Sequence, residues 1–181
     1  TTTDPGYSPA LGVWTINQGA AAMELKTPSI LDLTGNATID GATQPGGRGS
    51  GGPKIFVDTN DFSLQIRSNG NTIENIWMGL SADGQSVVFR TPGNTQRMAG
   101  GGVFLRSDNN TVRNSVITGA FARAISIEGG DNNTISGNRI GTRADGTVPA
   151  IDDAVKCDRN LTANGALWYG GWGIQTSGTA N

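Results

Sequence analysis

Aspartates in repeated turn sequences are the residues of this chain best suited to holding a hard metal ion. Asp83 and Asp145 each lie in an Ala-Asp-Gly sequence, at the same distance after an Asn-Thr pair. Asp108 and Asp131 also recur in register, each directly before two asparagines. Carboxylate and amide oxygens on turns are the ligands that calcium prefers, so the spacing predicts calcium as the one cofactor to consider at these four positions. Asp-Gly and Asp-Asn pairs also make good turns without any metal, and this alternative stays open.

The absence of histidine removes several kinds of active site. The 181 residues include no His, which excludes Ser-His-Asp and Cys-His catalysis, zinc held by imidazole and imidazole acid–base chemistry. Hydrolysis of a glycan would need carboxylates that converge at roughly 5–10 Å, and the repeats described below do not align acids in this way. The densest acidic group, Asp152, Asp153 and Asp158, lies in an irregular stretch typical of a solvated loop. The sequence therefore predicts a protein that is not an enzyme, with polysaccharide lyase or hydrolase activity as the alternative.

Two further sets of residues are candidates for modification or for contact with a partner. Asn-x-Thr sequences form N-glycosylation acceptors at Asn36, Asn109, Asn132 and Asn160. Two of these acceptors belong to a repeated corner motif, which produces the pattern without any sugar. The densest aromatic group consists of Trp168, Tyr169 and Trp172. Its rings either stack on sugars or a neighbouring subunit, or pack over the end of the fold.

The elements that position these residues form an internal repeat. Three segments align without a gap from their Asn-Thr pairs onward, at residues 71–79, 110–118 and 133–141. The lead-ins also match, at residues 64–68, 103–107 and 125–129. Each unit is a short strand, an Asn-rich corner and a second short strand. Because so small a unit cannot bury its own apolar face, the copies must stack on one another.

The stacking predicts columns of like residues about 4.8 Å apart. The expected inward columns are Ile73, Val112 and Ile135; Met78, Ile117 and Ile140; and Leu64, Val103 and Ile125. The corner asparagines, Asn71, Asn110 and Asn133, are expected to form a ladder of side-chain amides that satisfy each other and the nearby backbone. The spacing from Asn110 to Asn133 fits one coil of a three-sided β-helix. Arg106 and Glu128 share an outer column and are expected to form an exposed ion pair.

The repeat divides the chain into two parts. Residues 1–24 are expected to form an extended N-terminal lead with a first strand and a short cap helix near 18–25, and residues 25–181 the β-helix. Insertions are expected near 82–101 and 142–172. Residues 174–181 repeat the lead-in once more, which predicts an unfinished face at the C-terminal end of the stack.

Composition agrees with a fold of many short strands and tight turns. The chain has 28 glycines, and only 15% of its residues are charged, with a net charge of −2. It offers no basic surface for nucleic acid and no apolar run of the ~20 residues needed to span a membrane. Cys157 is the single cysteine, so an internal disulfide is excluded.

At this level the chain resembles the right-handed parallel β-helix repeat proteins of bacterial and archaeal surfaces, the pectate-lyase-like superfamily in its broad sense. The resemblance rests on residues 38–46, 132–147 and 173–178 and covers about residues 25–181. It implies an all-β, single-stranded, right-handed parallel β-helix placed outside the cell or in its envelope, often within a much larger protein. The motifs that carry the resemblance are specific for the fold and indicate little about activity.

The leading hypothesis is a non-enzymatic extracellular or cell-surface structural protein that associates head to tail with itself. A contact of this kind does not close, so it would give a filament or surface layer. Residues 1–10 are expected to be extended and able to pair with a neighbour. The alternatives are a carbohydrate-binding or polysaccharide-cleaving β-helix, whose groove the two insertions would line, and a fragment of a larger adhesin. Glycans are the second candidate partner.

Overall fold

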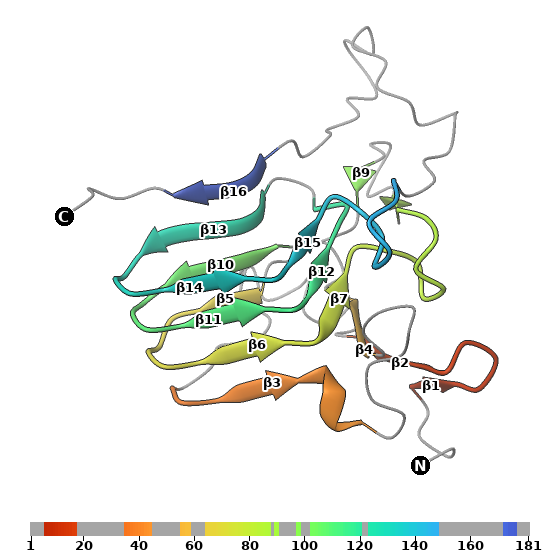
Figure 1. Ribbon diagram of the computed structural model, residues 1–181, viewed down its shortest axis with the longest axis horizontal. Coiled ribbons are helices and arrows are strands. Elements are labelled where there is room, and N and C mark those ends of the chain that lie inside the picture. The colour runs from red at the N-terminus through yellow and green to blue at the C-terminus, as the bar shows by residue number, and fades with distance from the viewer. Residues whose placement is uncertain are drawn as a thin grey trace, which may run out of the picture.

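The computed structural model describes residues 6–17, 35–44, 55–58, 64–87, 89–90, 97–98, 102–120, 123–148 and 172–176. In these residues the chain winds in stacked coils through three sheets, in which strands of neighbouring coils pair in parallel (Figure 1). The architecture is the parallel β-helix that the repeats predict. The cap helix expected near residues 18–25 lies outside the described residues, and the short 3-10 helix η2 (Gly41–Thr43) follows β3.

Sheet I has six strands, in the spatial order β1 (Tyr7–Ser8), β2 (Val13–Asn17), β4 (Ile55–Asp58), β7 (Ile76–Met78), β12 (Val116–Ile117) and β15 (Arg139–Ile140). Sheet II runs β5 (Leu64–Ile66), β10 (Val103–Arg106), β13 (Arg123–Gly129) and β16 (Trp172–Thr176). Sheet III runs β3 (Thr38–Asp40), β6 (Thr72–Glu74), β11 (Thr111–Arg113) and β14 (Thr134–Ser136).

Three full coils pass through sheets II, III and I in turn. Coil 1 consists of β5, β6 and β7, coil 2 of β10, β11 and β12, and coil 3 of β13, β14 and β15. Strands β2, β3 and β4 lie on the N-terminal side of this stack, and β16 lies on coil 3. All pairings between coils are parallel and in register, apart from a shift between Leu105 and Arg106.

The predicted inward columns are confirmed. Val112 pairs with Ile73 and Ile135, and the columns through Ile117 and Val103 follow the same register. Their middle members, including Ile73 and Val112, are fully buried, with no exposed surface. Each coil thus contributes one or two apolar side chains per strand to a continuous core.

The core columns end in exposed side chains at both ends of the stack. On sheet I the column begins with Ile16, which is 51% exposed, and on sheet II it ends with Ile174, also 51% exposed. Ile39, Ile135 and Ile140, the other terminal members, are half-buried. We name Ile16 and Ile39 the N-end face, and Ile135, Ile140 and Ile174 the C-end face. Neither group has a coil beyond it within the described residues.

The predicted asparagine ladder is also confirmed. The side-chain Oδ1 of Asn110 accepts from the backbone amide of Asn71 at 2.8 Å and from the Asn71 Nδ2 at 3.0 Å. Asn133 Oδ1 accepts from the Asn110 amide at 2.9 Å. Asn71 and Asn110 are completely buried. The ladder therefore satisfies backbone groups at a corner where strand pairing is interrupted.

Asparagine serves the corners in a second way, through left-handed backbone. Asn109 and Asn132 have φ of +57°, and Asn75 and Asn114 have φ of +56° and +51°. Asn is the non-glycine residue that adopts this region with least strain, because its short amide hydrogen-bonds locally. This preference explains why each short strand can turn sharply into the next.

Ion pairs lie on the outer faces of the sheets. The predicted pair of Arg106 and Glu128 is confirmed at 2.6 Å, and Arg123 reaches the same carboxylate at 2.9 Å. On sheet III, Arg113 pairs with Glu74 at 2.7 Å. All are partly exposed, so each contributes little to stability.

Among the described residues, antiparallel pairing occurs in two strand pairs and in an isolated bridge between Leu80 and Val87. At the N-terminal end, β1 pairs with β2, and the rings of Tyr7 and Trp14 stack with centroids 4.4 Å apart. Part of the segment expected to pair with a neighbour therefore folds back on its own chain. In the insertion expected near 82–101, β8 (Phe89–Arg90) pairs with β9 (Arg97–Met98).

In the part of the chain that is described, no helix is long and apolar enough to cross a bilayer. The domain boundary near residue 24 stays a prediction.

Candidate functional site

Two copies of one turn project from the corner that follows sheet I. In the first, the Gly84 amide donates to the Ser81 carbonyl at 2.7 Å; in the second, the Gly146 amide donates to the Arg143 carbonyl at 3.0 Å. Both glycines have positive φ, +72° and +89°. The turn sequence Ala-Asp-Gly therefore repeats as geometry, with the aspartate at the tip each time.

The order of the coils leaves a space between the two turns. The first turn follows coil 1 and the second follows coil 3, whereas coil 2 has no Ala-Asp-Gly sequence at this offset. Because neighbouring coils lie about 4.8 Å apart, turns on coils 1 and 3 are separated by roughly two such steps. The missing turn of coil 2 thus opens a gap on the side of the stack.

An apolar cluster on the outer face of sheet I forms the base of this region. The outward column Phe56, Trp77 and Val116 is buried, and Ala82 and Ala144 of the two turns pack against it. The edge of the Trp77 ring lies so close to Gly84 that a β-carbon there would meet the Trp77 Cζ3 at 2.7 Å. Only glycine allows this turn to close over the indole.

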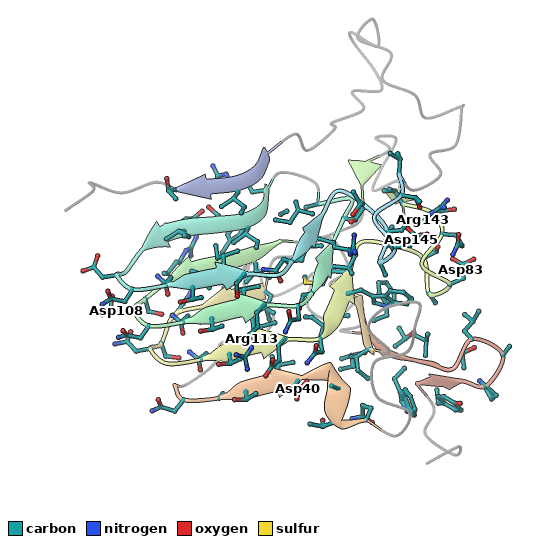
Figure 2. All side chains as sticks on the ribbon, in the orientation of Figure 1. Asp40, Asp83, Asp108, Arg113, Arg143 and Asp145 are labelled. Carbon is teal, nitrogen blue, oxygen red and sulfur yellow. The ribbon has the colours of Figure 1, made fainter. Side chains whose placement is uncertain are left out.

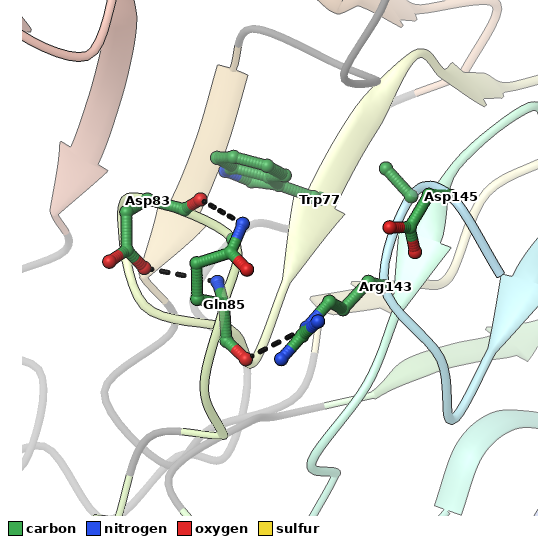
Figure 3. Close-up of a pocket in the computed structure, with 7 residues that line it drawn as sticks. Trp77, Asp83, Gln85, Arg143 and Asp145 are labelled. Atoms are coloured by element: carbon green, nitrogen blue, oxygen red, sulfur yellow. Dashed lines mark hydrogen bonds between the residues drawn. The ribbon is translucent and has the colours of Figure 1, made fainter. Parts of the chain in front are cut away.

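A pocket of about 100 Å³ lies between the turns (Figure 3). Its lining residues are Trp77, Asp83, Gly84, Gln85, Arg143, Ala144 and Asp145. Arg143 bridges the gap, since its Nε donates to the Gln85 carbonyl at 3.0 Å. Figure 3 shows the two aspartates on opposite sides, with Gln85 and Arg143 between them.

Each pocket carboxylate is anchored by one oxygen to its own turn. Asp83 Oδ1 accepts from the Ser81 hydroxyl and from the Gln85 amide. Asp145 Oδ1 accepts from the hydroxyl and the amide of Thr147, at 2.7 and 2.8 Å. These hydrogen bonds, led by those from the two hydroxyls, hold the pKa of both carboxyl groups below the ordinary value. Both groups are therefore ionised at neutral pH.

The four aspartates predicted to bind calcium do not form one group. Asp83 and Asp145 share the pocket with Arg143, whereas Asp108 lies on the opposite side of the stack (Figure 2). There, Asp108 Oδ1 accepts from the Asp131 amide at 2.9 Å, which links coil 2 to coil 3. Among the described residues, no three Asp, Glu, Cys or His side chains come together as a metal site requires.

The other predicted site residues lie at the corners or outside the described residues. Asn36, Asn109 and Asn132 are exposed and have positive φ, so each occupies a tight corner next to the ladder. Asn160, Trp168, Tyr169 and the side chain of Trp172 lie outside the described part, as do Asp152, Asp153 and Asp158. Glycosylation and aromatic contacts stay predictions.

Sequence reasoning missed Trp77, Gln85 and Arg143 as pocket residues. The sequence contained a signal for two of them: Gln85 directly follows the first Ala-Asp-Gly sequence, and Arg143 directly precedes the second. Trp77 occupies an outward strand position, and the alternation of a strand whose two faces are both buried does not mark it.

Comparison with known protein families places the chain in a family. The family model described as "Periplasmic copper-binding protein (NosD)" matches residues 26–164, which is more than half of the chain, and the family is one of right-handed β-helices. No curated protein and no solved structure matches the chain significantly.

This match corrects the expected cofactor. The prediction of calcium, with no other cofactor, is wrong, because the family is described as binding copper. The physical reason is visible in the turns: the aspartates serve as hydrogen-bond acceptors for turn amides and hydroxyls, which is what Asp-Gly sequences do without a metal.

Copper itself does not fit the donors that the structure describes. Copper in proteins is held by imidazole, thiolate and thioether groups, and this chain has no histidine. Met78 is the one sulfur side chain among those described; it is fully buried in the core and packs against other apolar residues. Copper therefore enters no step of the function proposed below.

Proposed function

The chain belongs to the NosD family of periplasmic copper-binding proteins, and from this premise we propose that it is a non-enzymatic β-helical scaffold outside the cytoplasm that associates end to end with further copies. Placement at the cell surface, and growth into a filament or layer, are parts of the same proposal. The observation that carries it is the exposure of the core columns at both ends of the stack.

The two end faces match each other in chemistry. The N-end face presents Ile16 on sheet I and Ile39 on sheet III, and the C-end face presents Ile140 and Ile135 on the same two sheets. The column of sheet I has five members, from Ile16 to Ile140, and that of sheet III has four, from Ile39 to Ile135. Stacking of one copy on another would therefore continue the sheet I column at the spacing found between coils and leave one strand position open on sheet III. The contact is heterologous, because different faces meet, and so it propagates rather than closes.

The expected strength of this contact is modest. Burial of the remaining surface of a half-exposed isoleucine contributes about 1 kcal/mol, so the five side chains of the two faces contribute at most about 5 kcal/mol. Loss of translational and rotational freedom costs roughly 4–15 kcal/mol. Assembly is therefore expected only at high protein concentration, or where the chains are concentrated locally. The β1–β2 hairpin reduces the contact further, because it covers part of the edge of β2.

The hydrogen bonds that lower the pKa of the two pocket carboxyl groups support the non-enzymatic part of the proposal. General-acid catalysis of glycan cleavage needs a carboxyl group whose pKa is raised, so that it carries a proton near neutral pH. The pKa values of Asp83 and Asp145 are instead lowered. Neither group has a proton to give at the pH at which such an acid would act.

Sedimentation velocity of end-face variants tests the association. Ile16→Glu and Ile174→Glu alter side chains that are already half-exposed, so the fold is expected to survive. Val148→Glu is the matched control, since Val148 is 75% exposed and lies in the segment after β15, outside the core columns that end in Ile140 and Ile174. The wild type and the control should associate as concentration rises, and the two end-face variants should remain monomeric. Equal behaviour of all four proteins would contradict the proposal.

The pocket between the turns favours a second candidate function, the binding of a neutral saccharide. Asp83, Asp145 and Arg143 leave one excess negative charge, which disfavours acidic ligands, while the guanidinium opposes cations. Hydroxyl groups donate to carboxylates and accept from guanidinium, and Trp77 with Ala144 offers an apolar wall for C–H groups.

Calorimetric titration with cellohexaose, xylohexaose and mannohexaose tests this candidate, with an oligogalacturonate as the acidic comparison. The double variant Asp83→Asn, Asp145→Asn keeps the oxygen that each turn needs but replaces the outer oxygen by an amide. It should weaken binding at least tenfold, while Asp131→Asn, on the far side of the stack, should not. Absence of binding to every probe at millimolar concentration would remove this candidate.

A further inference from the structure

Asn69 and Gly70 form the one Asn-Gly pair within the described residues, and Asn69 is exposed to solvent. Such a pair is prone to deamidate without an enzyme, because glycine has no side chain to hinder attack by its backbone nitrogen. The Gly70 nitrogen bonds to Asn69 Cγ and loses its proton, and the side-chain nitrogen of Asn69 leaves as ammonia. Water then opens the resulting succinimide at either carbonyl, which gives aspartate or isoaspartate.

The peptide group between these two residues is held from both sides. The Asn69 carbonyl accepts from the Asn36 amide at 3.1 Å, on the side of β3. The Gly70 amide donates to the Asp108 carbonyl of coil 2, also at 3.1 Å. Because this carbonyl and this amide belong to one planar peptide group, the two bonds fix its orientation between the neighbouring corners.

The side chain that would be attacked is held by the same residue of coil 2. Asn69 Oδ1 accepts from the Asp108 amide at 2.9 Å. Asp108 therefore engages both reacting groups, the Gly70 N–H through its carbonyl and the Asn69 amide through its own N–H. Ring closure needs the Gly70 nitrogen to give up its proton and turn toward Asn69 Cγ, so the bond to the Asp108 carbonyl must break first.

We propose that Asn69 is a deamidation site that is closed in the folded stack and reacts when the corner between coils 1 and 2 opens locally. Corners of a stack can open without loss of the whole fold, as hydrogen exchange shows for other proteins. The site depends on neither end-to-end association nor saccharide binding. Its modification records each opening of this corner as a lasting chemical change.

The isoaspartate product does not fit the closed corner. Isoaspartate adds one carbon to the main chain directly before Gly70, where φ is +74° and a β-carbon would lie 2.5 Å from Asn36 Oδ1. The next residue, Asn71, is completely buried in the ladder. A lengthened chain cannot keep the contacts on both sides of Gly70, so the reacted corner stays open.

Deamidation of the full chain in the presence and absence of denaturant is the direct test. The protein is incubated at mildly alkaline pH in buffer or in guanidinium chloride, and mass spectrometry of its peptides follows replacement of the Asn69 NH2 group by OH. The reaction should be at least about tenfold slower in the folded chain. Equal rates in the two conditions would overturn the proposal.

Two variants separate local opening from global unfolding. Asn110→Ala removes the acceptor of the Asn71 amide, beside the reacting pair, whereas Ile117→Ala removes buried core from sheet I of the next coil. Under conditions where both remain folded, Asn110→Ala should speed deamidation about tenfold and Ile117→Ala should leave it near the wild-type rate. Equal acceleration by both variants would mean that only global unfolding exposes the site, and it would overturn the proposal. If a variant does not fold, exchange of the Gly70 amide in the wild type decides: exchange slower than deamidation would contradict a shared opening.

The fate of the corner is tested on the separated products. The Asn69→Asp variant has the composition of the isoaspartate form but a normal main chain, and it is the matched control. The isoaspartate form should melt at a clearly lower temperature than Asn69→Asp. Equal melting temperatures would show that the corner accepts the longer chain and would refute the claim that it stays open.

Discussion

Truncation of the central ladder asparagine, Asn110→Ala, should be among the most damaging single substitutions in the chain. Asn110 is completely buried, and its Oδ1 accepts from the amide and the side chain of Asn71. Its Nδ2 donates to the carbonyl and the hydroxyl of Ser107 at 3.0 and 3.1 Å. The substitution therefore removes all of these hydrogen bonds at once and leaves the buried Asn71 amide without an acceptor.

The expected loss of stability follows from these contacts. A buried donor left without a partner costs about 1–3 kcal/mol, and each further hydrogen bond lost costs about 1 kcal/mol. Asn110→Ala should therefore lower the free energy of unfolding by about 3–4 kcal/mol. Asn69→Ala is the control: Asn69 is exposed, and its Oδ1 accepts only from the Asp108 amide, which water can replace. Its cost should stay below about 1 kcal/mol.

Urea unfolding followed by circular dichroism measures both losses. The slope of the unfolding free energy against urea should be similar for the two variants, so that the midpoints report stability. If Asn110→Ala costs no more than Asn69→Ala, the ladder is not what holds the corners, and the reasoning from buried amides fails.

Two other predictions concern the backbone at a corner and the response to acid. In thermal unfolding, Gly130→Ala should lower the melting temperature far more than Gly141→Ala. Both positions have positive φ, but a β-carbon at Gly130 would lie 2.2 Å from the Ser107 carbonyl oxygen, whereas at Gly141 nothing lies within 4 Å. Equal melting temperatures of the two variants would contradict this close approach. The pKa of Asp40 lies below its ordinary value of 3.8, chiefly because the side-chain amide of Asn75 donates a hydrogen bond to it. The contribution of Asp40 to stability is therefore complete above that value and is lost as pH falls through the lower pKa of the folded state. Asp40→Asn should make the unfolding free energy less dependent on pH below about pH 4, and an unchanged dependence would refute the assignment.

The stack was predictable because its evidence is local and repeated. Residues at equal offsets from the Asn-Thr pairs fall in register, so the columns of Ile73 and Met78 and the asparagine ladder could be written down from spacing alone. The ion pair between Arg106 and Glu128 followed from the same alignment, although Glu128 sits beside a shift in register. In a linear stack of repeats each unit contacts only its neighbours, so the repeat period alone predicts which residues lie in contact.

The pocket and the role of the aspartates could not be predicted in the same way. The pocket exists because coil 2 lacks a turn that coils 1 and 3 possess, and such a gap is a property of three coils taken together. Arg143 bridges the gap to Gln85, a contact between residues that no repeat offset relates. The calcium prediction failed because spacing shows where Asp83 and Asp145 recur but not that one oxygen of each carboxylate already accepts hydrogen bonds from its own turn.

The central claim, that copies stack end to end through their core columns, is tested most directly by X-ray diffraction from aligned assemblies of the concentrated protein. Coils stacked along the assembly axis place every parallel strand perpendicular to that axis, so the account predicts a reflection at about 4.8 Å along the axis itself. The reflection should vanish, together with the assemblies, for Ile174→Glu. A reflection at the same spacing but perpendicular to the axis would mean that the copies associate side by side, and it would contradict the account.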